Sequence, residues 1–229
     1  TMIMIGDPQC QTSAQVERYR NETVPAMLST INNGQAKGLY PNVYGMTLGD
    51  ITFDSTNLWG DMKSTMTNLK TSAGKWFPIF QCIGNHDHNS LVKSNDYDAT
   101  GKYVEYFGPT DYSFNRGQVH VVVMDDIMCN TVSSNSSPNK ATWGYSAGFT
   151  QTQYKWFLED LAQVENKSDK VIFLCMHIPM RAGANSGGAS FNKNAHYADV
   201  LNQLKQFKEA HLMIGHTHYQ QNYIHTGYV

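Results

Sequence analysis

Five short apolar runs in this chain each end in a polar cluster of Asp, Asn or His, and this recurrence constrains the fold most. The runs have the length and composition of buried strands, and helical patterns lie between several of them. Such alternation predicts an α/β domain with a mostly parallel or mixed sheet. Ligands bind outside the carboxyl ends of strands in such sheets, so the clusters should meet at one edge. The five clusters are Gly6-Asp7-Pro8, Gly49-Asp50, Gly84-Asn85-His86-Asp87, His177 and Gly215-His216-Thr217-His218.

The intervening sequence carries helix, hairpin and loop signals. Apolar side chains at helical spacing predict helices over about 13–31, 58–69, 154–164 and 197–207. Two strand-like runs, 112–114 and 119–125, flank Asn115-Arg116-Gly117 and predict a hairpin. Long loops are expected at 88–102, 126–150 and 181–194, where they would shape a substrate pocket.

Composition narrows the class of partner. The chain has 229 residues, enough for one domain, and 17 basic against 19 acidic residues give a net charge of −2. This balance argues against nucleic acid and anionic membrane surfaces, which attract an excess of Lys and Arg. No apolar run approaches the ~20 residues of a membrane helix. A small phosphorylated substrate or a phosphoprotein fits this composition better.

The polar clusters contain carboxylate, amide and imidazole groups and no thiolate. Oxygen and nitrogen ligands suit Mn, Fe or Zn, and also Mg or Ca, but not copper(I) or iron–sulfur clusters. Two such metals ~3.5–4 Å apart can clamp a phosphate and activate a water between them. The residues themselves therefore indicate a two-metal hydrolase of phosphate esters.

The order of the motifs resembles the calcineurin-like metallophosphoesterase superfamily. The likeness rests on Gly6-Asp7-Pro8-Gln9, Gly49-Asp50, Gly84-Asn85-His86-Asp87, His177 followed by Pro179, and Gly215-His216-Thr217-His218. It implies a layered α/β/β/α sandwich of mixed sheets with a dinuclear site at the C-terminal ends of strands. It also implies a phosphomonoesterase or phosphodiesterase whose nucleophile is a metal-bridging hydroxide.

The resemblance assigns a role to each matching position. Asp7 and His218 correspond to ligands of the first metal, and Asp50 corresponds to the carboxylate that bridges both. Asn85, His177 and His216 correspond to ligands of the second metal. His86 corresponds to the histidine that contacts phosphate and protonates the leaving group, and Asp87 would orient it, as carboxylates beside a histidine do.

Two positions depart from the family pattern. Gln9 stands where a histidine is usual, and its amide could act as a weak metal ligand or lie just outside the ligand shell. This supports an alternative function, a non-catalytic binding or scaffold domain with a weakened first metal site. Phe53 stands where purple acid phosphatases carry a tyrosinate ligand, so no such ligand is expected here.

Other residues carry weaker signals. Arg181 could grip a substrate phosphate or be a solvated loop residue. Asp54 is expected to cap the following helix. His88 follows the Gly84-Asn85-His86-Asp87 cluster and could face the cleft, but a surface position is the favoured prediction. The low charge and Ser/Asn/Gly-rich loops favour a secreted or periplasmic protein. Because the chain begins close to Asp7 and ends soon after His218, we expect residues 1–229 to be one catalytic domain of a longer protein with further domains.

Overall fold

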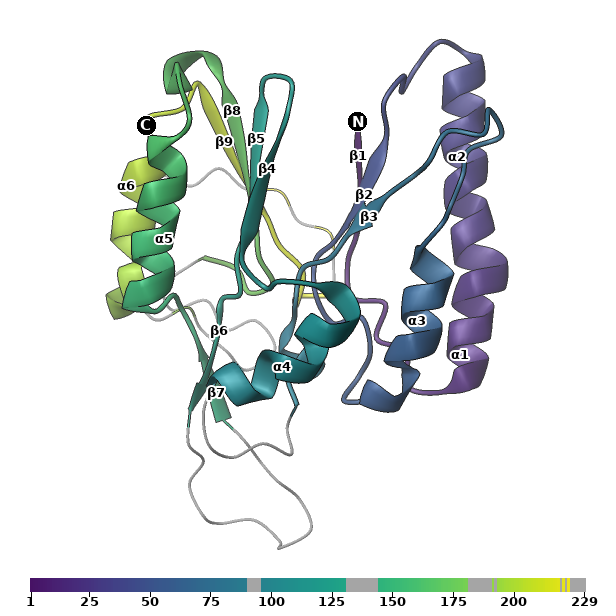
Figure 1. The fold of residues 1–229 in the computed structure, drawn as a ribbon, viewed down its shortest axis with the longest axis horizontal. Coiled ribbons are helices and arrows are strands. Elements are labelled where there is room, and N and C mark those ends of the chain that lie inside the picture. The colour runs from purple at the N-terminus through teal and green to yellow at the C-terminus, as the bar shows by residue number, and fades with distance from the viewer. Residues whose placement is uncertain are drawn as a thin grey trace, which may run out of the picture.

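The computed structural model describes residues 1–89, 96–130, 144–180, 191, 193–218, 220 and 222. Its main elements form two sheets that face each other, each with helices on its outer side (Figure 1). Among the described residues, no helix is both long and apolar enough to cross a membrane.

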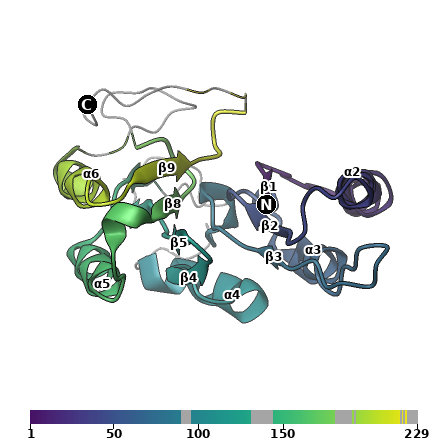
Figure 2. The ribbon, with the colours of Figure 1, turned by 90° about the horizontal axis from the view of Figure 1, so that it is seen from above.

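The first sheet is parallel and has the strand order β1-β2-β3. The outer helices are α1 (Ser13–Arg18), α2 (Val24–Ala36) and α3 (Trp59–Met66), seen beside the sheet in Figures 1 and 2. Pro25 lies in the first turn of α2, so the predicted helix over about 13–31 is divided into segments just before it. A π-helical segment, Tyr19–Thr23, joins α1 to α2. The strands are β1 (Met2–Ile5), β2 (Tyr44–Thr47) and β3 (Ile79–Phe80).

The second sheet has the order β4-β5-β8-β9. The strand β4 is antiparallel to β5, and the other pairs are parallel, so the sheet is mixed. Its outer face carries α5 (Gln151–Ala162) and α6 (Ala198–Leu204), as Figure 2 shows. The strands are β4 (Tyr112–Arg116), β5 (Val119–Val123), β8 (Val171–Cys175) and β9 (Glu209–Met213).

Three apolar cores separate four layers. Alternate side chains along β5 point to opposite faces: Val121 and Val123 join the core between the sheets, whereas Val122 joins the core under α5 and α6. The third core lies between the first sheet and its helices and contains Ile51 and Trp59. This arrangement confirms the predicted α/β/β/α sandwich, in which the second sheet is mixed and the described strands of the first sheet are parallel.

Two predicted loops contain regular structure. Segment 88–102 overlaps α4 (Asp96–Phe107), which buries Ala99, Thr100 and Tyr103 and packs Tyr106 and Phe107 against the core beside the first sheet. The rest of its early sequence is polar, which hid the helical period. Segment 126–150 contains the antiparallel pair β6 (Ile127–Asn130) and β7 (Gly144–Ala147), while residues 131–143 lie outside the described part.

Candidate metal centre and active site

The structure brings the predicted strand-end residues together. Asp7 follows β1, Asp50 follows β2 and Asn85 lies beyond β3, so the first sheet supplies these three. His177 follows β8, and the segment that contains His216 follows β9, so the second sheet supplies the histidines. The site therefore lies where the two sheets meet at their carboxyl ends.

Several of these residues have left-handed backbone conformations. The φ angles are 45° at Asp7 and Gln9, 52° at Asp50, 64° at His216 and 56° at His218. A side chain in this region costs roughly 1–2 kcal/mol per residue. Such strain persists where the surrounding structure overdetermines it, and it tends to gather at functional sites.

Two glycines allow the loops to approach closely. A Cβ atom at Gly49 would overlap the ring of His177, and one at Gly84 would overlap the main-chain nitrogen and carboxylate of Asp50. Glycine is therefore required for packing at these motif positions, and at Gly49 a φ of 90° adds a conformational reason.

Atoms that can donate electron pairs converge around the ring of His177. Its Nε2 lies 3.0 Å from Asn85 Oδ1, 3.2 Å from His216 Nδ1 and 3.3 Å from Asp50 Oδ2. His177 Nδ1 donates to the Leu48 carbonyl oxygen at 2.7 Å, which leaves the Nε2 lone pair for this cluster. Asp50, His177 and His216 are all buried.

The electrostatics of the cluster favour a positive charge at its centre. Burial alone would lower the pKa of His177, but the carboxylates of Asp50 and Asp7 raise it to about 10. Burial opposes ionisation of Asp50 as well, yet His177 holds the pKa of this carboxyl below its usual range. The proton on His177 thus compensates the negative charge of the carboxylates, and a divalent cation would compensate the same charge. The oxygen and nitrogen atoms of this cluster are ligands of the type that Mn, Fe and Zn accept.

A second group of potential ligands shares Asp50. Asp7, Asp50 and His218 each offer an atom within 4.8 Å of the others. His218 Nε2 lies 3.6 Å from Asp7 Oδ1, and Asp7 accepts the His216 main-chain N–H at 3.0 Å. Burial raises the pKa of Asp7. Asp50 therefore belongs to both groups of potential ligands.

Gln9 lies within this second group. Its Nε2 donates to Asp50 Oδ2 at 2.9 Å and lies 3.0 Å from His218 Nε2. The amide thus links Asp50 and His218 to each other. This position suits a residue just outside the ligand shell as well as it suits a weak metal ligand.

His86 has a different partner from the predicted one. Its Nδ1 lies 3.0 Å from Asp54 Oδ1, and its ring stacks on Phe53 with centroids 3.8 Å apart. Burial would lower the pKa of His86, but the hydrogen bond to Asp54 and the charge of Asp50 raise it. The prediction that Asp54 caps the next helix is wrong, because its side chain turns to His86.

The prediction that Asp87 orients His86 is also wrong. The Asp87 carboxylate is fully buried and accepts main-chain N–H groups of Ile51 (3.0 Å), Thr52 (3.2 Å) and Gly84 (3.1 Å). The short 3₁₀ turn Asn85–Asp87 directs this side chain into the protein. Burial and the charge of Asp50 raise the pKa of Asp87 to about 7.

Sequence reasoning missed three buried residues next to the site. His88 was expected at the surface but is buried, and its Nε2 lies 3.1 Å from Asp125 Oδ2. Asp126 accepts the main-chain N–H of His177. Asp125 and Asp126 follow the apolar run that ends β5, so the strand-then-carboxylate pattern that marked the other positions was present here too. Arg181 lies outside the described residues.

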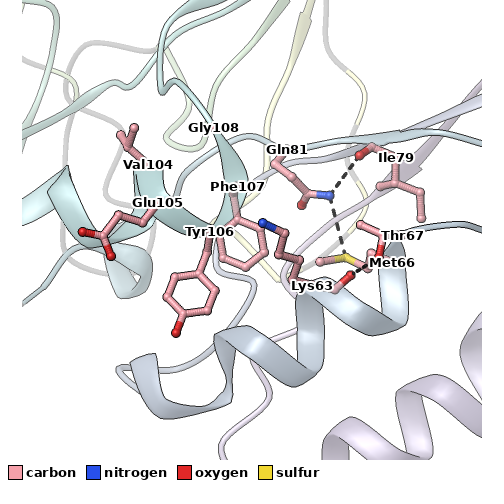
Figure 3. Close-up of a pocket in the computed structure, with 10 residues that line it drawn as sticks. All are labelled: Lys63, Met66, Thr67, Ile79, Gln81, Val104, Glu105, Tyr106, Phe107 and Gly108. Atoms are coloured by element: carbon pink, nitrogen blue, oxygen red, sulfur yellow. Dashed lines mark hydrogen bonds between the residues drawn. The ribbon is translucent and has the colours of Figure 1, made fainter.

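A pocket of about 440 Å³ lies elsewhere, between α3, β3 and the C-terminal end of α4 (Figure 3). Lys63, Gln81 and Phe107 are among the ten residues that line it, and none of the ten is a predicted site residue. The candidate site is therefore the strand-end cluster and not this pocket.

A four-layer α/β/β/α sandwich with carboxylates, an amide and histidines at its strand ends is the arrangement expected of a metallophosphoesterase. The family model for calcineurin-like phosphoesterases matches residues 4–220, and the chain belongs to this family. No curated protein sequence is similar enough to count as a relative.

Solved structures add support for the fold. A purple acid phosphatase from yellow lupin (Lupinus luteus) seeds superposes with a TM-score of 0.56 at 12% identity. The match covers 94% of this chain but only 37% of the lupin protein. A protein of unknown function from Aquifex aeolicus matches with a TM-score of 0.30 and 10% identity, over 94% of this chain and 88% of its own, and this match carries no argument.

Proposed function

We propose that this protein hydrolyses phosphate esters with the help of divalent metal ions. The observation that carries the proposal is the convergence on His177 Nε2 of Asn85 Oδ1, Asp50 Oδ2 and His216 Nδ1, at 3.0–3.3 Å. Membership of the calcineurin-like phosphoesterase family supports it at the level of the reaction class.

The proposed ligands divide between two ions. Asp50, Asn85, His177 and His216 would hold one ion, and Asp7, Asp50 and His218 would hold the other. When bound, such ions neutralise phosphate charge and lower the pKa of a water molecule towards neutrality. Mn, Fe and Zn fit these oxygen and nitrogen donors best.

His86 would act on the leaving group. Its main-chain N–H donates to Asp50 Oδ1 at 2.9 Å, which fixes the residue next to the proposed ions. Asp54 holds Nδ1, so Nε2 is the ring nitrogen that remains to contact phosphate or protonate the departing oxygen. We assign the orienting role to Asp54 and an anchoring role to Asp87.

The substrate would be a small phosphorylated compound or a phosphoprotein. The near-neutral net charge of −2 gives little attraction for long nucleic acid. Both monoesters and diesters are candidates, because two ions can clamp either group.

Hydrolysis of p-nitrophenyl phosphate and bis-p-nitrophenyl phosphate by chelator-treated protein with added Mn²⁺ tests the proposal. We expect metal-dependent turnover of at least one ester, and its loss in His216→Ala. Absence of turnover on both esters, with metal bound, would contradict it.

A second candidate function is a phosphate-binding or scaffold domain with a weakened first site. Gln9 favours it, since its amide bonds to Asp50 and contacts His218 where a further ligand would be expected. Binding of one ion per chain together with no turnover would support this candidate.

A further inference from the structure

The strand β5 carries none of the proposed ligands, yet it ends in two buried carboxylates beside them. Asp125 is 3% exposed and Asp126 is fully buried. Burying two carboxylates side by side is costly unless each is satisfied by hydrogen bonds. The hydrogen-bond partners of Asp125 and Asp126 therefore indicate what these two buried carboxylates do in the fold.

Asp126 holds the segment that presents His177. Its Oδ1 accepts the His177 main-chain N–H at 3.2 Å, and its Oδ2 accepts that of Ile178 at 2.8 Å. The parallel ladder between β5 and β8 ends at the pair Val123 and Cys175. Beyond this pair, the Asp126 carboxylate accepts the main-chain hydrogen bonds of the segment that follows β8, and it thereby fixes the main chain of His177, a proposed ligand.

Asp125 is linked through His88 to the turn that carries Asn85, the proposed ligand from the first sheet. His88 Nε2 lies 3.1 Å from Asp125 Oδ2, and its Nδ1 lies 3.0 Å from the Gly84 carbonyl oxygen. The two ring nitrogens of His88 thus face one acceptor each, so the ring bridges the Gly84 main chain and the Asp125 carboxylate. Gly84 begins the turn that presents Asn85.

We propose that Asp125 and Asp126 are positioning residues that tie the Asn85 turn and the His177 segment together at the proposed second-metal site. This inference rests on the proposed function. Partners outside the ligand shell typically change metal affinity 10- to 100-fold when they are replaced, and we expect losses in this range.

The test is calorimetric titration of the metal-free full chain with Mn²⁺. Asp126→Asn and Asp125→Asn are expected to weaken, about 10- to 100-fold, the binding step that His177→Ala abolishes. The matched control is Asp160→Asn: Asp160 also accepts from a buried histidine, His120 Nε2 at 2.9 Å, but lies on α5. Circular dichroism and melting in chelator report the folded fraction and stability of each variant.

The control separates positioning from general stability. Asp160→Asn should lower the melting temperature and leave the Mn²⁺ dissociation constant within twofold of the wild-type value. The reason is that its partner, His120, lies near the start of β5, whereas Asp125 and Asp126 follow the end of this strand. Unchanged affinity in folded Asp125→Asn and Asp126→Asn would overturn the positioning role while the proposed function stands. Failure of the unsubstituted chain to bind Mn²⁺ would instead overturn the proposed function.

His88→Asn serves if either aspartate variant does not fold. Asparagine can replace the Nδ1 bond to the Gly84 carbonyl, but it is too short to reach Asp125. The same weakening of Mn²⁺ binding is expected, and wild-type affinity in this variant would overturn the link through Asp125.

Discussion

Among the described residues, ten other than glycine have positive φ, and five of the ten belong to the proposed metal ligands or to Gln9 beside them. Within the described part of the chain, Asp7, Gln9, Asp50, His216 and His218 all have φ between 45° and 64°. Each directs its side chain from a tight turn after a strand. These residues are better suited to holding ligand atoms in place than to stabilising the fold.

Asp54 should affect catalysis more than metal binding. We expect Asp54→Asn to lower kcat about 10-fold or more for phenyl phosphate, whose leaving group needs a proton, and much less for p-nitrophenyl phosphate. Asp61→Asn, at an exposed position on α3, is the control. An equal loss on both esters would contradict the assignment of Asp54 to His86.

Gly49 should tolerate a side chain less well than another glycine with positive φ. Gly74 has a φ of 73° and open space around it, so Gly74→Ala should cost roughly 1–2 kcal/mol of unfolding free energy. Gly49→Ala adds the overlap with His177 and should cost more. Urea unfolding of both variants in chelator measures this, and equal losses would show that the overlap relaxes freely.

At the scale of elements, the N-termini of α1 and α5 carry the same capping box with different surroundings. Thr12 and Gln15 close the box on α1, and Thr150 and Gln153 close it on α5. Gln153 Nε2 also donates to Asp111 Oδ1 at 2.9 Å and to the Asp125 carbonyl oxygen. The cap of α5 is therefore also a contact between α5 and the second sheet.

Gln153→Ala should destabilise the protein more than Gln15→Ala. The loss of a capping group costs about 1 kcal/mol, and the loss of the Gln153 donor to the Asp125 carbonyl oxygen adds roughly 1–3 kcal/mol, whereas Asp111 keeps its bonds from Thr110 and the Asp125 N–H. Chemical denaturation of the two variants compares them directly. A loss at Gln153 no larger than at Gln15 would show that its tertiary bonds contribute nothing.

Asp111, just before β4, should make stability depend on pH. Burial and the charge of Asp125 raise its pKa to about 6, above an unfolded value of about 3.9. The folded state therefore binds this proton more tightly, and stability falls as pH rises from about 4 to 6 and then levels off. Relative to wild type, Asp111→Asn should gain roughly 2–3 kcal/mol across this interval, measured by unfolding in chelator. Parallel curves would contradict the raised pKa.

The sequence predicted the elements that carry strong periodicity and the residues that end strands. Asp7, Asp50, Asn85, His177 and His216 each follow a strand-like run, and this position predicted that they meet at one edge. The sequence could not show where the side chains of Asp54 and Asp87 point. The left-handed backbone of Asp54 and the 3₁₀ turn Asn85–Asp87 determine these directions. The sequence-based prediction also missed α4, because its core-facing aromatic residues, Tyr103, Tyr106 and Phe107, follow a polar first turn.

At the scale of the whole molecule, the two sheets contribute different proposed ligands to one candidate site. Asp50 and Asn85 come from the first sheet, and His177 and His216 come from the second. A metal ion bound between them would stabilise the packing of the two halves. An ion at 100 times its dissociation constant adds about 2.7 kcal/mol to the folded state.

Mn²⁺ should therefore raise the melting temperature of the metal-free protein by several degrees. In His216→Ala the increase should shrink, because a proposed ligand is lost, while Asp160→Asn should retain it. Differential scanning calorimetry with and without Mn²⁺ measures this. Equal shifts in all three proteins would place the binding elsewhere.

The most direct test of the central claim is anomalous diffraction from crystals of the protein soaked in Mn²⁺. The account predicts one anomalous peak among Asp50, Asn85, His177 and His216, and a second among Asp7, Asp50 and His218, with Asp50 touching both. Fully occupied ions at other places, with no peak beside Asp50, would contradict it.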